Sequence, residues 1–190
     1  MSAGIIAGSD GRRRCPWGDT PEIYRGYHDT EWGTELHGRD ALYERLSLEA
    51  FQSGLSWITV LRKREAFRAA FAGFDPEVVA GYGPADVQRL MSDVGIVRNQ
   101  AKVDAAIANA RVVLQTDDLD ALLWSFVPEC EPPRPASTAE VPAITPESTA
   151  MAVELKRRGF RFVGPTTAYA LMQATGMVDD HLVGCWRTGA

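Results

Sequence analysis

Apolar residues recur three and four positions apart along most of the chain after Arg39, and alternating runs of β-branched residues are few. This spacing places apolar side chains on one face of a helix. Two regular stripes cover Leu42–Phe51 and Val60–Phe71, and Ser56 precedes the second stripe as a predicted N-cap. The pattern predicts an all-α fold.

Proline and glycine mark where several predicted helices begin and end. Pro76 and Pro84 occupy the first position of two short helices, where the amide hydrogen that proline lacks is not needed. Gly95 ends the second of these, and a long helix is predicted from about Arg98 to Leu114. Two helices are therefore joined by a very short turn.

The C-terminal half contains three further predicted helices and one long loop. The helices run over Leu119–Val127, from Thr145 to Gly159 and from Thr166 to Thr175. Residues 128–145 contain too many prolines for any helix, because each proline removes a hydrogen bond and clashes with the preceding turn. They predict a surface loop.

Length and composition fit one globular protein of 190 residues, of which 45% are hydrophobic and 24% charged. We expect residues 15–190 to form a single helical domain of two lobes that share a cleft, and residues 1–14 to be a disordered tail. No stretch approaches the roughly 20 apolar residues of a membrane helix. With only three cysteines, a disulfide framework is not expected. These features predict a soluble, cytoplasmic monomer.

The net charge of −5 opposes binding to nucleic acid, because cations that meet phosphates supply much of the affinity for DNA. Basic residues are nonetheless clustered at 62–64, at Arg98 with Lys102, and at 156–161. These clusters predict either a positive face on an acidic protein or ordinary solvated helix faces. The charge pattern leaves both interpretations open.

Residues that commonly bind metals stand near both ends of the chain: Cys15, His28, His181 and Cys185. Such a Cys2His2 set suits a structural zinc, which would close a loop of nearly the whole chain. His37 and Cys130 are spare residues that could replace a member. Spacing alone leaves the alternative that each is an ordinary buried residue.

Aromatic residues crowd the first third of the chain: Trp17, Tyr24, Tyr27, Trp32, Tyr43, Phe51 and Trp57. Some of them must belong to the core. Tyr24, Tyr27 and Trp32, however, occupy a stretch rich in Gly, Asp and Thr without an obvious helical period. Rings in irregular backbone beside a cavity suit stacking on a planar ligand such as an unstacked base.

Glu49 interrupts an otherwise apolar helical segment between Leu46 and Phe51. A carboxylate is costly to bury unless it finds hydrogen-bond donors, and the exocyclic amine of a base could supply them. The alternative interpretation places Glu49 on a solvated helix face.

Several longer blocks strongly resemble the type I 3-methyladenine DNA glycosylases across residues 15–186. These blocks are Cys15-Pro16-Trp17, Tyr27-His28-Asp29 with Glu31-Trp32-Gly33, Gly54-Leu55-Ser56-Trp57-Ile58-Thr59-Val60-Leu61, Trp124-Ser125-Phe126-Val127, Lys156-Arg157-Arg158-Gly159-Phe160 with Phe162-Val163-Gly164, and Asp180-His181 followed by Cys185. The blocks are long and ordered, so chance agreement is negligible beside the short motifs above.

The resemblance implies a helix-hairpin-helix DNA glycosylase fold and a structural Zn²⁺ that joins the N- and C-terminal segments. The zinc ligands implied are Cys15, His28, His181 and Cys185. The base pocket implied has Glu49 as its catalytic residue, Tyr27 and Trp57 as substrate-binding residues, and Trp17, Tyr24 and Trp32 as further walls.

The hairpin itself is predicted at the turn Gly95-Ile96-Val97. Its amides, together with Arg98 and Lys102, are candidate contacts to a DNA phosphate. The wider superfamily commonly has two glycines in this turn and a catalytic aspartate about twenty residues later. Here there is one glycine, and we interpret the residues at that distance, Asp117 and Asp118, as loop or cap residues.

The implied activity is hydrolysis of the N-glycosidic bond of 3-methyladenine in alkylated double-stranded DNA, with free 3-methyladenine as product. Methylation makes the base a cation that leaves readily, so base flipping, stacking and polar recognition suffice. The hairpin contains no lysine for a Schiff base, so a monofunctional enzyme without lyase activity is expected. Three alternatives are a catalytically inactive nucleic-acid-binding helix-hairpin-helix module, a zinc hydrolase and a structural adaptor.

Overall fold

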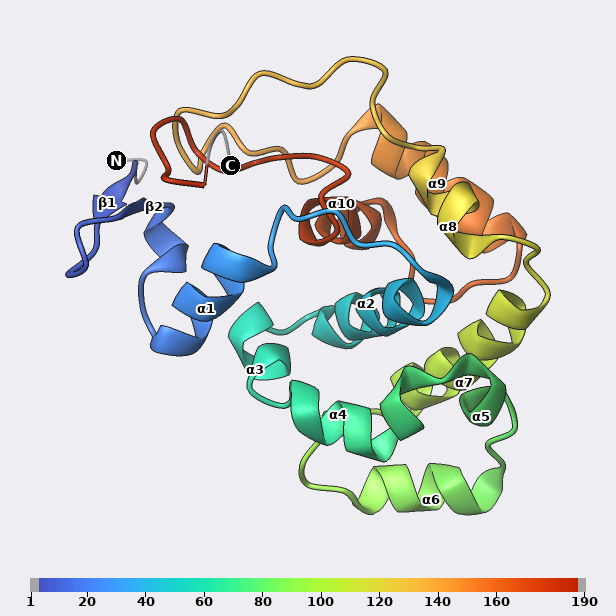
Figure 1. Ribbon diagram of the computed structural model, residues 1–190. Helices are drawn as coiled ribbons and strands as arrows, with labels where there is room; N and C mark the ends of the chain where they lie inside the picture. Colours follow the sequence, from blue (N-terminus) through green and yellow to red (C-terminus); the bar gives the residue numbers. More distant parts are fainter. Residues whose placement is uncertain (1–3, 188–190) are drawn as a thin grey trace.

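The computed structural model describes residues 4–187, and that part of the chain is mostly helical, which confirms the predicted helical class (Figure 1). The described α-helices are α1 (Glu22–Thr30), α2 (Arg39–Gln52), α3 (Trp57–Leu61), α4 (Arg64–Ala70), α5 (Pro76–Ala80), α6 (Pro84–Ser92), α7 (Gln100–Leu114), α8 (Leu119–Trp124), α9 (Pro146–Arg157) and α10 (Pro165–Ala174). Two short 3-10 helices, η1 (Pro16–Gly18) and η2 (Ala72–Phe74), and two short strands complete the elements.

Local sequence signals explain several helix starts. The side chain of Asp75 accepts a hydrogen bond from the Glu77 amide at the start of α5, and Thr145 does the same for Ser148 at α9. Helix α7 begins two residues later than predicted because Asn99 is its N-cap. The second predicted stripe is divided into α3 and α4.

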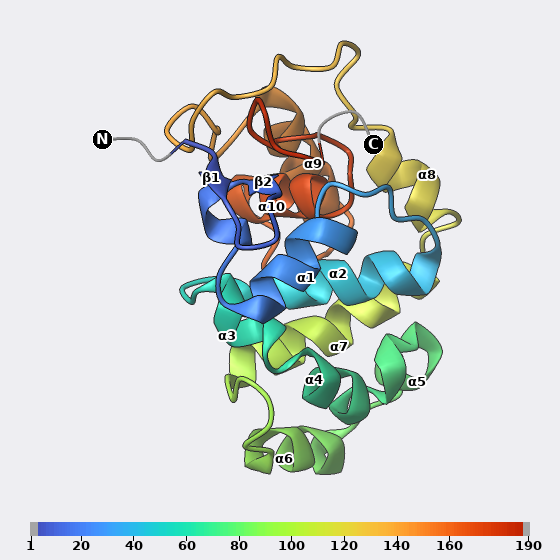
Figure 2. The ribbon, with the colours of Figure 1, turned by 60° about the vertical axis from the view of Figure 1, so that its left-hand side comes forward.

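Helix α2 lies at the centre of the molecule and is buried on most of its faces (Figures 1 and 2). It packs against α3, α7, α8 and α10. Its buried apolar side chains join a core whose bulkiest fully buried members are aromatic: Tyr43, Phe51, Phe67, Phe71 and Phe74. The Tyr43 hydroxyl donates to the Ala106 carbonyl over 2.9 Å, so its buried polar atom is satisfied.

The segment that carries Tyr24 and Tyr27 forms helix α1, which the sequence analysis did not predict. Tyr24, Tyr27 and His28 lie on α1 at positions three and four apart and therefore share one face. Tyr27 and His28 are buried, whereas the residues on the other side of α1 are exposed. The irregular backbone expected there is wrong for Tyr24 and Tyr27, because burial of one helix face outweighs the weak helical propensity of this stretch, and it is confirmed for Trp32, which lies in a turn after α1.

Residues 4–14 are structured, so the expected disordered tail is wrong for the described part of it. Strand β1 (Ile6–Ala7) pairs antiparallel with β2 (Arg13–Arg14). Arg14 is fully buried and forms salt bridges with Asp10 and Asp29 at 2.6 and 2.7 Å. A buried guanidinium needs such partners, and they hold the hairpin on the protein.

Hydrogen bonds join described residues near the beginning of the chain to described residues near its end. The Trp186 amide donates to the Arg13 carbonyl over 2.8 Å, and the Leu182 amide donates to Cys15 Sγ over 3.4 Å. The proline-rich loop 128–145 crosses to the same region, where the Pro135 carbonyl accepts from the Val183 amide. Within the described part of the chain, none of the helices is both long and apolar enough to span a membrane.

Gly176 lies two residues after the end of α10, and we expect a side chain at this position to destabilise the protein. Its φ is +74°, and a Cβ there would lie 2.6 Å from backbone atoms of Thr34 and Glu35. We expect Gly176→Ala to lower the free energy of unfolding by about 2–4 kcal/mol, through backbone strain and overpacking together. Chemical denaturation measures this change.

Gly73→Ala is the matched control, because Gly73 also has a positive φ (+68°) but open space around its Cβ position. Backbone strain alone should then cost about 1 kcal/mol. Equal losses in the two variants would contradict the close approach inferred at Gly176.

Candidate functional site

A cavity of about 340 Å³ opens between the N-terminal segment, α2, α3 and α10. All five aromatic residues that the sequence analysis assigned to a pocket line it: Trp17, Tyr24, Tyr27, Trp32 and Trp57. Its polar lining includes Glu49, Gln52, Gln173 and Asp180. A mostly apolar cavity with a few converging polar groups is typical of a small-ligand site.

The aromatic rings hold one another in place. Trp17 meets Trp32 edge-on at 4.9 Å between ring centroids, and Tyr24 at 5.7 Å. Tyr27 and Trp57 are tilted by 46° at 5.4 Å. The Tyr24 hydroxyl accepts from the Ile58 amide over 2.9 Å, which links α1 to the start of α3. The edge-on contacts of Trp17 and this hydrogen bond together keep the rings in a fixed arrangement.

Glu49 enters the cavity from α2 with only 5% of its surface exposed, so the alternative of a solvated face is wrong. Burial raises the pKa of its carboxyl group to about 7, and Arg45 opposes this shift. Among residues 4–187, no hydrogen bond joins this carboxyl group to another protein group. The carboxyl group is therefore poised to bind a donor or a cation that a ligand would bring.

Arg45 is the buried cation nearest to this site, and its hydrogen bonds serve other groups. It donates to the Tyr27 hydroxyl over 3.1 Å and lies 3.5 Å from the Glu31 carboxylate. Its guanidinium carbon lies 5.6 Å from the centre of the Trp57 ring. The indole nitrogen of Trp57 is buried and has no hydrogen-bond partner in the part of the chain that the structure describes, so this ring also offers a donor.

Three of the polar residues of the cavity that sequence reasoning missed are Gln52, Gln173 and Asp180, and the last two form a hydrogen-bonded group. Gln173 Nε2 donates to Asp180 Oδ2 over 2.7 Å, and the Tyr169 hydroxyl donates to the same oxygen over 2.6 Å. Asp180 stood in one of the recognised blocks, next to His181, but nothing in its spacing indicated a cavity. Its role depends on α10 packing against the last segment of the chain.

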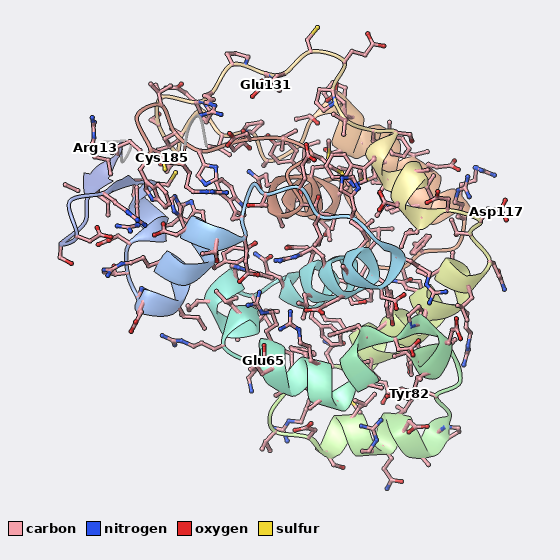
Figure 3. All side chains as sticks on the ribbon, in the orientation of Figure 1. Arg13, Glu65, Tyr82, Asp117, Glu131 and Cys185 are labelled. Carbon is pink, nitrogen blue, oxygen red and sulfur yellow. The ribbon has the colours of Figure 1, made fainter. Side chains whose placement is uncertain are left out.

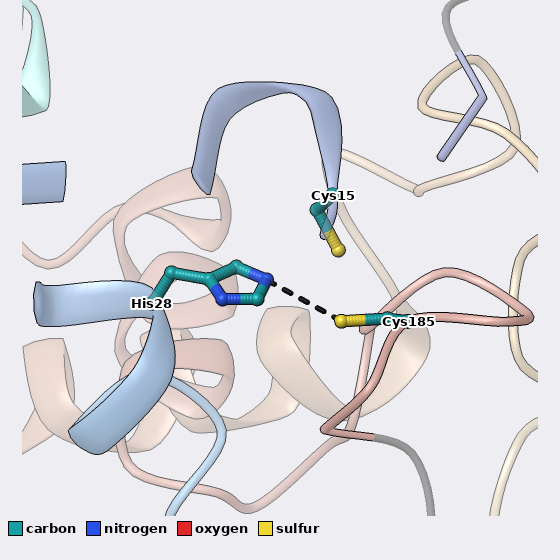
Figure 4. Close-up of side chains that lie close together, drawn as sticks. All are labelled: Cys15, His28 and Cys185. Atoms are coloured by element: carbon teal, nitrogen blue, oxygen red, sulfur yellow. Dashed lines mark hydrogen bonds between the residues drawn. The ribbon is translucent and has the colours of Figure 1, made fainter. Parts of the chain in front are cut away.

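Cys15, His28 and Cys185 form a buried cluster that could hold a metal ion, with their ligand atoms all within 4.8 Å of one another (Figure 4). His28 Nε2 lies 3.5 Å from Cys185 Sγ. A hydrogen bond from Cys15 and the proximity of His28 lower the pKa of the Cys185 thiol. The cluster joins the first and last parts of the chain, as predicted for three of the four residues.

His181 lies beside this cluster but outside the group of mutually close ligand atoms. Its ring centroid is 5.0 Å from that of His28, and its Nε2 is buried with no hydrogen-bond partner among the described residues. Its Nδ1 contacts Asp179 at 2.8 Å, and His28 Nδ1 contacts Asp29 at 2.9 Å. Carboxylates behind both rings are typical of metal-ligating histidines.

The two spare ligands lie elsewhere. His37 stacks on Trp124 with 4.3 Å between ring centroids and hydrogen-bonds Asp120, and Cys130 is exposed on the proline-rich loop. Neither belongs to the cluster.

The predicted hairpin turn lies between α6 and α7, but only part of it is available to a phosphate. The Gly95 amide is occupied by Asp93 Oδ1 at 2.7 Å, and Ile96 is buried at 3% exposure. Lys63 donates to the Gly95 carbonyl over 3.1 Å and so orders the turn. Arg98 is exposed.

Lys102 requires a correction, because it is 6% exposed and does not face solvent. Its ammonium group donates to the carbonyls of Phe51 and Ser53 at the end of α2. Carbonyls at a helix C-terminus lack intrahelical partners, and a lysine can satisfy them. A surface contact with phosphate is incompatible with this burial.

Asp117 and Asp118 lie at the start of α8, and the cap interpretation is confirmed for Asp118, whose carboxylate accepts from the Ala121 amide. Figure 3 places Asp117 on the opposite side of the molecule from Cys185, whose cluster partner Cys15 lines the cavity. The proline-rich loop, whose role was not predicted, contributes Thr138 and Val141 to the cavity wall.

Comparison with known proteins agrees with this geometry. A sequence profile of the methyladenine glycosylase family matches residues 17–188. The chain belongs to the methyladenine glycosylase family. DNA-3-methyladenine glycosylase 1 of Escherichia coli (strain K12) is 46% identical over 177 residues, which cover 90% of this chain and 95% of that protein. DNA-3-methyladenine glycosylase of Haemophilus influenzae is 42% identical, with 90% and 96% covered.

Solved structures of the methyladenine glycosylase family share the fold. A crystal structure of 3-methyladenine DNA glycosylase I superposes with a TM-score of 0.88 at 44% identity, covering 92% of this chain and 98% of that one. A single-residue variant of 3-methyladenine DNA glycosylase I in complex with 3-methyladenine gives a TM-score of 0.85 at 33% identity, covering 90% and 95%.

Burial of Glu49 predicts a pH-dependent stability difference. The folded protein favours the neutral carboxyl group of Glu49 more than the unfolded chain does. The contribution of Glu49 to the free energy of unfolding is therefore greatest below pH 4.5 and is lost as the pH rises through about 7. Glu49→Gln should therefore gain about 3 kcal/mol relative to the wild type between these two pH values. Urea unfolding of both proteins across this range measures the difference.

Glu131→Gln on the exposed proline-rich loop is the matched control and should show no such trend (Figure 3). A constant difference between Glu49→Gln and wild type at every pH would show that Glu49 is not desolvated.

Proposed function

We propose that this chain is a monofunctional DNA glycosylase that hydrolyses the N-glycosidic bond of 3-methyladenine in alkylated double-stranded DNA. The observation that carries the proposal is the buried Glu49 carboxyl group, which has no hydrogen-bond donor from the described residues inside a cavity walled by aromatic rings. The names of the relatives and the 3-methyladenine bound in a solved member of the family support it.

Methylation at N3 gives adenine a positive charge, and such a base leaves the sugar as a neutral molecule. A strong general acid is therefore unnecessary. The flipped base would stack against Tyr27 and Trp57. The carboxylate of Glu49 would accept a hydrogen bond from the polar edge of the base and would balance the positive charge of the base. Attraction between these charges is stronger inside a cavity than in water, so a damaged cationic base is favoured over ordinary adenine.

Water is the nucleophile in this mechanism. A lyase reaction needs an amine that attacks the sugar, and the residues that line the cavity in the described part of the chain include no lysine. Lys102 is bound to backbone carbonyls. We therefore expect base release without cleavage of the DNA strand.

DNA would be held at the turn between α6 and α7. Arg98 is the exposed cation of this turn, and the start of α7 adds the partial positive charge of a helix N-terminus. Contacts of this kind position the duplex without reading its sequence.

The proposal is tested with methylated DNA, from which the wild type should release 3-methyladenine without nicking the strand. Trp57→Ala should weaken binding of the free base about tenfold or more, because base–aromatic stacking contributes about 1–3 kcal/mol. Isothermal titration with free 3-methyladenine measures the affinity, and circular dichroism checks the fold. Glu49→Gln should also weaken binding.

Wild-type protein that binds the free base but releases none from methylated DNA would instead indicate an inactive binding module. Unchanged affinity in both variants would remove Glu49 and Trp57 from the pocket. Trp124→Ala, on α8 outside the cavity, serves as the matched tryptophan control.

We further propose that the Cys15, His28 and Cys185 cluster is completed by His181 and holds a structural Zn²⁺. The support is chemical: two thiols and two imidazoles are ligands that zinc prefers, and the buried Nε2 of His181 has no hydrogen-bond partner among residues 4–187. When bound, zinc would cross-link the two ends of the chain. Four protein ligands leave no position for water, so a hydrolytic role for the metal is disfavoured.

Metal analysis of the purified protein should find about one zinc per chain. His181→Ala should lower both the zinc content and the unfolding temperature, because a buried ligand and a link between the chain ends are lost. His37→Ala, outside the cluster, should keep its zinc. Equal zinc content in the two variants would exclude His181 as a ligand.

A further inference from the structure

Gln173 is the polar side chain on a wall of small residues. Ala170, Gln173 and Ala174 line the cavity from α10, because positions three and four apart share one helix face. The two alanines leave room for a flat ligand to approach. A ligand against this wall would meet the side chain of Gln173.

The side-chain amide of Gln173 is fixed in one orientation. A carboxylate oxygen accepts hydrogen bonds, so the amide nitrogen must face Asp180, which it does at 2.7 Å. The hydroxyl of Tyr169 anchors the same carboxylate at 2.6 Å, and Asp180 and Tyr169 are 7% and 3% exposed. This contact uses one amide hydrogen and leaves the carbonyl oxygen Oε1 as the acceptor that the amide can offer to a ligand.

The backbone around Gln173 is fixed as well. Its carbonyl accepts from the Gly33 amide over 3.0 Å, directly after the cavity residue Trp32. Two residues later, the Thr175 carbonyl accepts from the Leu36 amide over 3.1 Å. The end of α10 is thus tied to the segment that carries another cavity wall, and a fixed acceptor discriminates better than a mobile one.

We propose that Gln173 is a specificity-determining residue whose Oε1 accepts a hydrogen bond from the exocyclic amine of the bound base, and that Asp180 is its positioning residue. The inference rests on the proposed function and extends it. Glu49 on α2 and Gln173 on α10 offer acceptors from two helices, and a 6-amino group carries two hydrogens. A 6-oxo purine would place an oxygen against the Oε1 of Gln173, so the cavity selects amino over oxo purines.

The test compares free 3-methyladenine with 3-methylhypoxanthine, which carries oxygen in place of the amine. Gln173→Ala should weaken binding of 3-methyladenine about tenfold and leave binding of 3-methylhypoxanthine unchanged or stronger. The affinity ratio of the two ligands should then fall at least tenfold. Gln115→Ala, at the exposed end of α7, is the matched control and should keep the wild-type ratio.

Asp180→Asn provides a second variant of nearly unchanged shape. An asparagine can present either its oxygen or its nitrogen, so the Gln173 amide becomes free to turn over. The ligand ratio should fall in this variant too, with zinc content measured in parallel because His181 is adjacent.

A purely structural role would weaken both ligands equally, and an unchanged ratio in Gln173→Ala would overturn the inference. Failure of the wild type to bind 3-methyladenine or to release it from DNA would instead overturn the proposed function. The two failures are therefore distinguishable.

Discussion

The junction between the two ends of the chain is the constraint on which the cavity depends. Trp17 follows Cys15 by two residues, and Leu182 and Asp180 approach from the other end, so the cavity walls on this side come from segments that meet only at the junction. Closing a loop of nearly the whole chain has an entropic cost, which the buried contacts around Cys185 must offset. Arg14, fully buried among carboxylates, fixes the N-terminal side of the same junction.

The second constraint is electrostatic and lies at α2. Glu49 is deeply buried, and this burial raises the pKa of its carboxyl group to about 7; within the described part of the chain no group donates a hydrogen bond to it. Such a carboxyl group costs stability in its charged form, and natural folds keep this kind of strain where a ligand relieves it. Arg45 could have relieved it directly, but its hydrogen bond goes to Tyr27. The arrangement keeps the carboxyl group available for a donor or positive charge that enters from outside.

Local signals predicted the helices after Arg39 well, because caps such as Asp75 and Thr145 act within a few residues of themselves, whereas helix α1 was missed. Features that depend on distant partners could not be predicted in this way. Arg14 was assigned to a disordered tail and Lys102 to a surface contact with DNA. Arg14 is instead buried against Asp29, 15 residues later, and Lys102 against the carbonyls of Phe51 and Ser53, 51 and 49 residues earlier. The position of Glu49 in an apolar stripe was equally compatible with a buried carboxylate and with a solvated helix face. The packed structure shows that Glu49 is buried.

The pair of Gln173 and Asp180 shows why cavity chemistry is harder to predict than fold. Neither residue interrupts a pattern, and their contact arises because α10 and the last segment of the chain pack together. A cationic base that leaves without a strong acid places little demand on proton transfer, so discrimination depends on which hydrogen-bonding groups the cavity presents and how firmly they are held. The acceptor of Gln173, which Asp180 fixes, and that of Glu49 on α2 meet this demand. Neither residue type by itself indicates a base-binding site in a sequence.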